Sequence, residues 1–199
     1  MRYPPGQKAR ARDALVRAGT RSLKTSGFNG IGVDGLAAAA GVTSGAFYSN
    51  FPSKTAILEA VVEAGLGEPF VTDTGAMTHA EARAHMVAFL HGYMNTDHSL
   101  DVAGGCVMPA LSADVSRAEP SVKETYERKM IALIDRITEL LDGDESDRRR
   151  RAWSIVALMV GSVLISRGMP EQSETRSAAL DSALATVSAL MDVGAEAQR

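Results

Sequence analysis

Apolar residues recur at helical spacing along most of this 199-residue chain. In one stretch, Met86, Phe89, Leu90, Tyr93 and Met94 fall at i, i+3, i+4, i+7 and i+8, which is the apolar face of one α-helix. Comparable patterns predict helices over 7–25, 33–40, 44–51, 52–66, 78–94, 105–116, 120–141, 151–167 and 174–191. Aromatic residues make up only 5% of the chain, while Ala, Leu, Val and Met are plentiful. We therefore predict an all-α protein of about nine helices.

One interruption of this pattern predicts a domain boundary. Gly65, Gly67 and Pro69 break the helical periodicity, and residues 67–77 are typical of a loop. We expect an N-terminal domain over 1–66, which includes the linking helix 52–66, and a larger helical domain over 67–199.

The stretch from Gly27 to Lys54 carries the most specific local pattern. A short helix over 33–40 ends in four alanines, and Gly41-Val42-Thr43 then forms a turn before a second short helix. Gly41 suits the left-handed conformation that ends a helix, and the hydroxyl of Thr43 or Ser44 can cap the next one. Two short helices joined by such a turn form a helix-turn-helix, whose second helix enters the DNA major groove.

The charge of the chain is divided unevenly. Residues 1–60 hold eight Lys and Arg against three acids, a net charge of +5. The overall net charge is −3, so residues 61–199 carry a net charge of −8. A basic domain attached to an acidic one is expected where only the first meets DNA. A basic helix that is merely solvated is the alternative.

Several motifs of this segment together resemble one family. They are Gly27-Phe28, Val33-Asp34, Ala39-Ala40-Gly41-Val42, Gly45-Ala46-Phe47-Tyr48, Phe51, Ser53-Lys54 and Leu58. Over residues 8–62 the chain resembles the N-terminal domain of the TetR (tetracycline repressor) family of transcriptional regulators. The resemblance implies a homodimer that binds a palindromic operator in double-stranded DNA, is released by a small-molecule effector and represses transcription. Gly35 departs from the family pattern, at a cost of about 1 kcal/mol relative to alanine inside a helix.

The helix-turn-helix reading assigns DNA contacts by residue. Thr43, Ser44, Gly45 and Phe47 are expected at base edges or thymine methyl groups, whereas Tyr48, Asn50 and Lys54 are expected at phosphates. The family resemblance adds Lys8 and Arg12, at the start of the first helix, as candidates for backbone contacts.

The last two predicted helices point to a dimer. The helix over 151–167 is apolar nearly all round and needs cover on more than one side, while 174–191 has a narrow apolar stripe typical of a bundle seam. We predict a four-helix interface with two helices from each chain. Its residues would be Trp153, Val156, Val160, Leu164, Leu180, Leu184, Val187 and Met191.

The resemblance also implies a ligand pocket in the C-terminal domain. Adaptable Met, Tyr and Trp side chains are suitable pocket liners, although such stripes are usually core. The candidate ligand-binding residues are Met86, Phe89, Tyr93, Cys106, Tyr126, Met130 and Trp153.

Cys106, the only cysteine, supports an alternative function. It lies at a predicted helix N-terminus, where the helix dipole favours the thiolate. A Gly-Cys start followed by an Ala-Leu-rich helix resembles a sub-pattern among these regulators, some of which sense oxidants or electrophiles. Cys106 is therefore either a buried structural residue or the sensor of a thiol-based repressor.

Other classes of function lack support. Four histidines have no metal-ligand spacing, and no catalytic set or phosphate loop is visible, so we expect no enzyme, metal or cofactor. Arg148–Arg151 is read as a solvated helix start. The first five residues precede charged ones instead of an apolar run, and the longest apolar stretch, 155–165, is too short to cross a bilayer. We expect a cytoplasmic protein without membrane contact.

Overall fold

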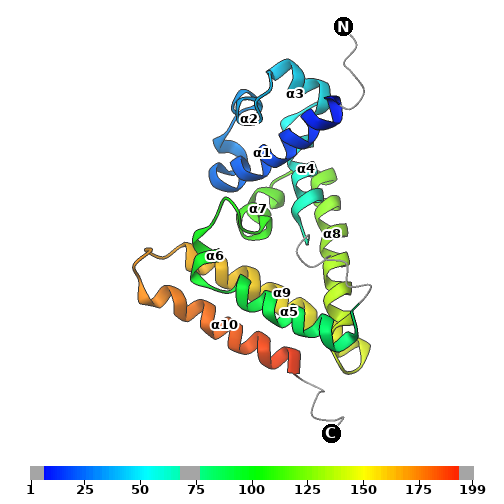
Figure 1. Cartoon of the computed structure of the whole chain (residues 1–199), viewed down its shortest axis with the longest axis vertical. Coiled ribbons are helices and arrows are strands. Elements are labelled where there is room, and N and C mark those ends of the chain that lie inside the picture. Colours follow the sequence, from blue (N-terminus) through cyan, green and yellow to red (C-terminus); the bar gives the residue numbers. More distant parts are fainter. Residues whose placement is uncertain (1–6, 68–76, 193–199) are drawn as a thin grey trace. The chain divides into compact units, whose positions relative to one another are not determined.

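A computed structural model describes residues 7–67 and 77–192, which form helices and turns without a strand (Figure 1). The helices are α1 (Gln7–Gly30), α2 (Val33–Ala39), α3 (Ser44–Asn50), α4 (Lys54–Gly65), α5 (His79–Tyr93), α6 (Thr96–Leu100), α7 (Val107–Ser116), α8 (Pro120–Glu139), α9 (Glu145–Arg167) and α10 (Glu174–Asp192). The predicted all-α fold is confirmed. The sequence reading missed α6, whose single turn is too short for a periodic pattern and begins where Asn95 Oδ1 accepts from His98 N at 2.8 Å.

The chain forms two compact units, and each includes two separate stretches of sequence. The first unit contains residues 1–66 and 102–129, and the second contains 67–101 and 130–199. One of these divisions follows residue 66. Residues 102–129, which we expected in the C-terminal domain, cluster with the first unit because α7 docks on α1 through contacts that helical periodicity does not encode.

The first unit is built around α1, which contacts α2, α3, α4 and α7. Leu15, Leu23, Phe47, Ile57 and Leu58 are completely buried in its core. Two polar contacts hold α7 to α1. Lys24 Nζ donates to Gly105 O at 2.5 Å, and Phe28 N donates to a carboxylate oxygen of Asp114 at 2.9 Å. The DNA-binding candidates therefore lie on a scaffold that includes residues from the middle of the chain.

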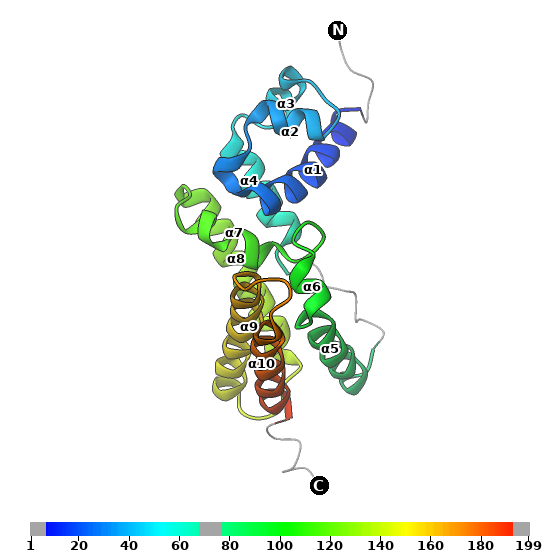
Figure 2. The same ribbon diagram turned by 90° about the vertical axis from the view of Figure 1, so that its left-hand side faces the viewer.

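In the second unit, α9 and α10 lie side by side (Figures 1 and 2). Four predicted dimer-interface residues, Val156, Leu180, Val187 and Met191, are at most 4% exposed within this single chain. Within the single chain these four side chains are covered, because the narrow stripe of α10 packs on α9 of the same chain. Trp153 and Leu164 are exposed, and Val160 and Leu184 are half-buried.

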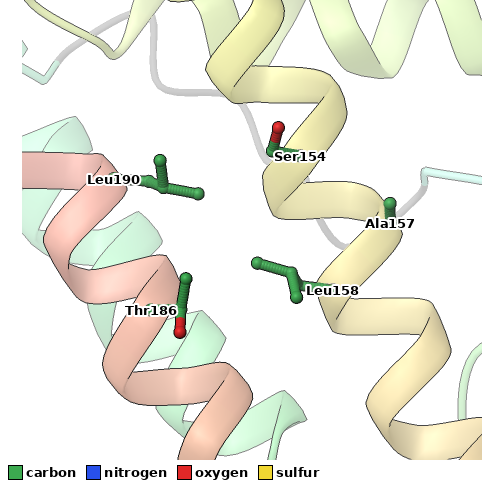
Figure 3. Close-up of a pocket in the computed structure, with 5 residues that line it drawn as sticks. All are labelled: Ser154, Ala157, Leu158, Thr186 and Leu190. Atoms are coloured by element: carbon green, nitrogen blue, oxygen red, sulfur yellow. The ribbon is translucent and has the colours of Figure 1, made fainter.

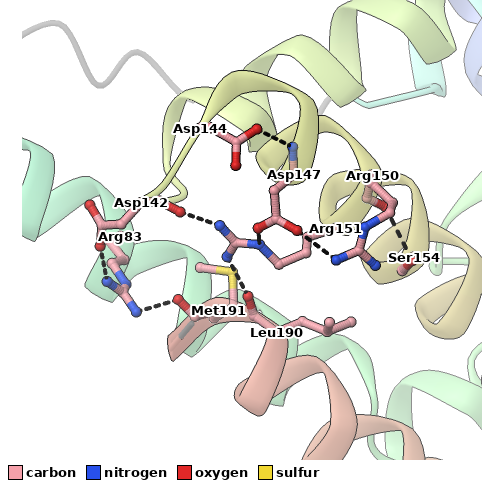
Figure 4. A network of polar contacts seen from close by, with 9 residues as sticks. All are labelled: Arg83, Asp142, Asp144, Asp147, Arg150, Arg151, Ser154, Leu190 and Met191. Carbon is pink, nitrogen blue, oxygen red and sulfur yellow. Dashed lines mark hydrogen bonds and ion pairs between the residues drawn. The ribbon is translucent and has the colours of Figure 1, made fainter. Parts of the chain in front are cut away.

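Arg151 lies at the centre of a polar network in the second unit (Figure 4). Its side chain is 1% exposed and donates to Asp147 Oδ2 and Leu190 O, each at 2.7 Å, and to Asp142 O. The tract 148–151 is therefore not simply a solvated helix start. The spacing of Asp147 and Arg151 on α9 is local, but periodicity could not show the burial, because the other two acceptors come from the α8–α9 loop and from the end of α10.

Arg83, on α5, completes this network. It donates to Asp142 Oδ2 at 2.8 Å, to Asp192 Oδ1 at 2.9 Å and to Met191 O. The carbonyls of Leu190 and Met191 belong to the last turn of α10, where a helix lacks its own backbone donors. Two guanidinium groups thus supply the missing donors and fix the end of α10.

Candidate nucleic-acid interface

The turn between α2 and α3 has the geometry that the sequence predicts. Gly41 has a φ of 66°, the left-handed region in which a side chain is costly, and Val42 N donates back to Ala37 O at 2.9 Å. Thr43 is the N-cap of α3, since its hydroxyl oxygen accepts from Ala46 N at 3.2 Å. Figure 2 shows α2 and α3 as two short helices joined by this turn.

The structure explains Gly35, the departure from the family pattern. A Cβ atom at this position would lie 2.8 Å from Ile31 Cγ1, which is closer than side-chain packing permits. Glycine at position 35 lowers the helix propensity of α2, but its missing side chain leaves room for Ile31 to pack closely against the helix.

One side of α3 is exposed and the other is core. Thr43, Gly45 and Tyr48 are exposed, with Tyr48 at 58%, while Ser44 is half-buried. Phe47 is completely buried, and its ring lies 6.0 Å from that of Phe51. The assignment of Phe47 to a base contact is corrected by this burial. Phe47 and Phe51 are four residues apart and so share one helix face, a signal that the sequence already contained.

Comparison with known proteins identifies this domain. A sequence model described as "Bacterial regulatory proteins, tetR family" matches residues 15–61, which include α2, α3 and the turn between them. The match covers this domain alone, so residues 15–61 are similar to the N-terminal domain of that family. No curated protein matches the sequence significantly.

Solved structures of TetR-family regulators share the fold of the chain. A TetR-family regulator from Cytophaga hutchinsonii is 18% identical in sequence with a TM-score of 0.75, and the aligned region covers 95% of this chain and 96% of the regulator's chain. The TetR regulatory protein from Rhodobacter sphaeroides is 21% identical with a TM-score of 0.68, covering 90% and 98%. The reduced form of E. coli NemR is 22% identical with a TM-score of 0.69, covering 89% and 94%. At these identities the similarity establishes the fold.

In the domain that matches this family model, three of the side chains predicted to contact the DNA backbone have defined local contacts. Lys54 Nζ lies 4.3 Å from the centre of the Phe28 ring, a cation–π distance. Asn50 Nδ2 donates to Ala46 O at 2.8 Å, and Asn50 O accepts from Arg12, whose guanidinium lies 4.3 Å from the Phe51 ring centre. These contacts hold Arg12 at the end of α3 and Lys54 at the start of α4.

Asp34 is a residue whose position the sequence reading did not use. Its Oδ1 accepts from Ser44 Oγ at 2.6 Å, which joins the first turn of α2 to the first residue of α3. The ten-residue separation gave no periodic signal, because the turn alone brings the two side chains together. Ser49, also exposed on α3, donates to Gly45 O at 2.9 Å.

The predicted ligand-binding residues divide between the two units. Cys106 and Tyr126 belong to the first unit, where Cys106 Sγ accepts from Met108 N at 3.4 Å and Tyr126 Oη lies 2.9 Å from Ser112 Oγ. In the second unit, Met86, Tyr93 and Met130 are buried, Phe89 is half-buried, and Trp153 is 45% exposed. Trp153 therefore lies at the surface of α9.

A groove opens at the surface between α9 and α10 (Figure 3). It is shallow and open to solvent, has a volume of about 510 Å³ and is lined by Ser154, Ala157, Leu158, Thr186 and Leu190. These differ from the residues predicted to hold a ligand.

Within 7–67 and 77–192, no helix combines the length and apolar character that crossing a membrane requires.

Proposed function

We propose that this TetR-family chain binds a palindromic DNA operator as a homodimer and represses transcription until a small molecule binds the C-terminal domain. The observation that carries the proposal is the capped helix α3, with Thr43, Gly45 and Tyr48 exposed, in a domain of positive net charge. Thr43, Ser44 and Gly45 would approach base edges, while Tyr48, Asn50 and Lys54 would contact phosphates.

Dimerisation is supported by the exposed apolar side chains of α9. Trp153, Leu164 and Ile165 are 45%, 55% and 57% exposed, and the groove beside α10 adds apolar surface. Exposed apolar side chains gathered on one helix are common at protein interfaces. A two-fold dimer would present two copies of α3, so the two half-sites of the operator should be separated by a whole number of helical turns.

A small-molecule effector can release DNA only if it prefers the conformation that does not bind the operator. The buried Met86, Tyr93 and Met130 side chains supply adaptable apolar surface in the second unit. We therefore propose an apolar or amphipathic effector that changes the separation of the two α3 helices.

Footprinting on DNA upstream of the coding region tests the function directly. We expect protection of two inverted half-sites, and Lys54→Ala should weaken binding to all sequences by a similar factor. The slope of log K against log salt should fall by about one unit, because one phosphate contact is lost. Absence of ordered protection at any sequence would contradict the proposal, and a loss confined to one base position would contradict the phosphate role of Lys54.

A thiol-based mechanism through Cys106 is the second candidate. Cys106 caps α7 and is half-buried, and one structure of the same fold is that of the reduced form of E. coli NemR. In this alternative, oxidation or alkylation of the sulfur would disturb the start of α7, which is docked on α1 in the same unit.

A quinone or reactive aldehyde separates these alternatives. If Cys106 is the sensor, the reagent should release DNA from the wild-type protein and leave the Cys106→Ser complex intact. Equal release from both proteins, or from neither, would assign Cys106 a structural role. The DNA affinity of the untreated variant, measured first, provides the control.

A further inference from the structure

The contact between Asp34 and Ser44 has a chemical consequence for the reading of bases. Ser44 Oγ donates its hydrogen to Asp34 Oδ1 at 2.6 Å, a short bond to a carboxylate. A serine hydroxyl has only one hydrogen, and its two lone pairs remain available. While this bond persists, Ser44 can accept a hydrogen bond and cannot donate one.

Other hydroxyls near the start of α3 have different roles. Thr43 Oγ1 accepts from Ala46 N, so one of its two lone pairs is engaged and its hydrogen is not used in that bond. Ser49 Oγ donates to Gly45 O, inside the same helix. Among these three groups, Ser44 alone has its donor capacity set by a residue of the preceding helix. The carboxylate of Asp34 also adds negative charge beside it.

In the major groove, the donors are the amino groups of adenine N6 and cytosine N4. Guanine O6 and N7 and thymine O4 are acceptors. An oxygen that can only accept pairs with an amino group and is repelled by an acceptor. We propose that Asp34 determines base specificity by making Ser44 an acceptor that selects adenine or cytosine at one position of each half-site. This inference rests on the proposed DNA-binding function.

Asp34 could instead only fasten α2 to α3. In that case its removal would weaken binding to every sequence by one factor, because the position of the whole α3 helix would change. Control of the hydroxyl hydrogen predicts another result. Without Asp34, the hydroxyl of Ser44 can rotate and donate to guanine or thymine. The affinity for operators with guanine or thymine at this position should then rise relative to the affinity for operators with adenine or cytosine.

The test measures affinity of the full-length protein for operators carrying each of the four bases at every half-site position. For the wild-type protein, we expect adenine or cytosine to be favoured by about tenfold over guanine and thymine at one position. The preference should fall to about threefold or less in Asp34→Ala and vanish in Ser44→Ala. Asp34→Asn keeps an oxygen that can accept from Ser44, so it should retain a larger part of the preference than Asp34→Ala.

Asp13→Ala is the matched control for charge, since Asp13 is an exposed acid on α1. It should leave the base preferences unchanged. An equal loss on all operators in Asp34→Ala, or an unchanged preference, would overturn the inference while leaving DNA binding established. Absence of binding by the wild-type protein would overturn the proposed function itself. Thermal melting of each variant verifies that the helix-turn-helix remains folded, and Asp34→Asn provides the test if Asp34→Ala does not fold.

Discussion

Replacing Arg151 with Met is expected to lower the free energy of unfolding by about 3 kcal/mol, an effect typical of removing a buried hydrogen-bonded charge. Met preserves much of the side-chain volume, so the loss is mainly polar. The carbonyls of Leu190 and Asp142 would each lose a donor from the guanidinium group. An unsatisfied acceptor costs about 1–3 kcal/mol when it is buried. These two carbonyls are part-buried, so each contributes at the lower end of that range, and the lost partner of Asp147 adds the rest.

Thermal and urea unfolding measure this effect, with Arg150→Ala as the control. Arg150 donates to the same carboxylate, at 2.6 Å from Asp147 Oδ1, but its side chain is 68% exposed. Its replacement should change stability by about 0.5 kcal/mol or less. If both variants melted together with the wild-type protein, the network would not support the end of α10.

The same network predicts a dependence on pH. Hydrogen bonds from Arg150 and Arg151 lower the pKa of Asp147 below its ordinary value of 3.8. The folded-state pKa lies below the unfolded one, so the stabilisation is complete above pH 3.8 and is lost as pH falls through the lowered value. The difference in stability between the wild-type protein and Arg151→Met should therefore narrow in acid.

The sequence predicted features that depend on neighbouring residues. The glycine turn at 41, the hydroxyl cap at Thr43 or Ser44 and the helix bounds around them follow from local chemistry, and in the structure Thr43 is the cap. Phe47 could also have been placed correctly, because its spacing from Phe51 already indicated a shared buried face. Local patterns were thus sufficient where the relevant partner lay within about one helical turn.

Features that depend on distant segments were not predictable in this way. Arg151 looked solvated because one of its acceptors, Leu190 O, lies 39 residues away on another helix. The apolar stripe of α10 indicated a seam but did not distinguish a helix of the same chain from a helix of a partner. Periodicity indicates which face of a helix is buried, but only the tertiary structure shows which segment packs against that face.

Replacing Leu164 with Glu is expected to convert the proposed dimer into a monomer. Leu164 is 55% exposed in the single chain, so a carboxylate there remains hydrated and the protomer should keep its fold. In a two-fold interface the substitution would place two like charges in an apolar contact, at a cost of several kcal/mol. We expect the dimer dissociation constant to rise at least about 100-fold, as measured by analytical ultracentrifugation.

The loss of the dimer should carry over to DNA. A monomer contacts one half-site, and losing the linked second contact typically lowers affinity about 10²–10⁴-fold. Ile131→Glu is the matched control, because Ile131 is 39% exposed but lies on α8 and not on α9 or α10. It should preserve both the dimer and operator binding. Dimerisation that persists in Leu164→Glu would place the interface elsewhere, whereas a monomer with unchanged operator affinity would show that the two α3 helices do not act together.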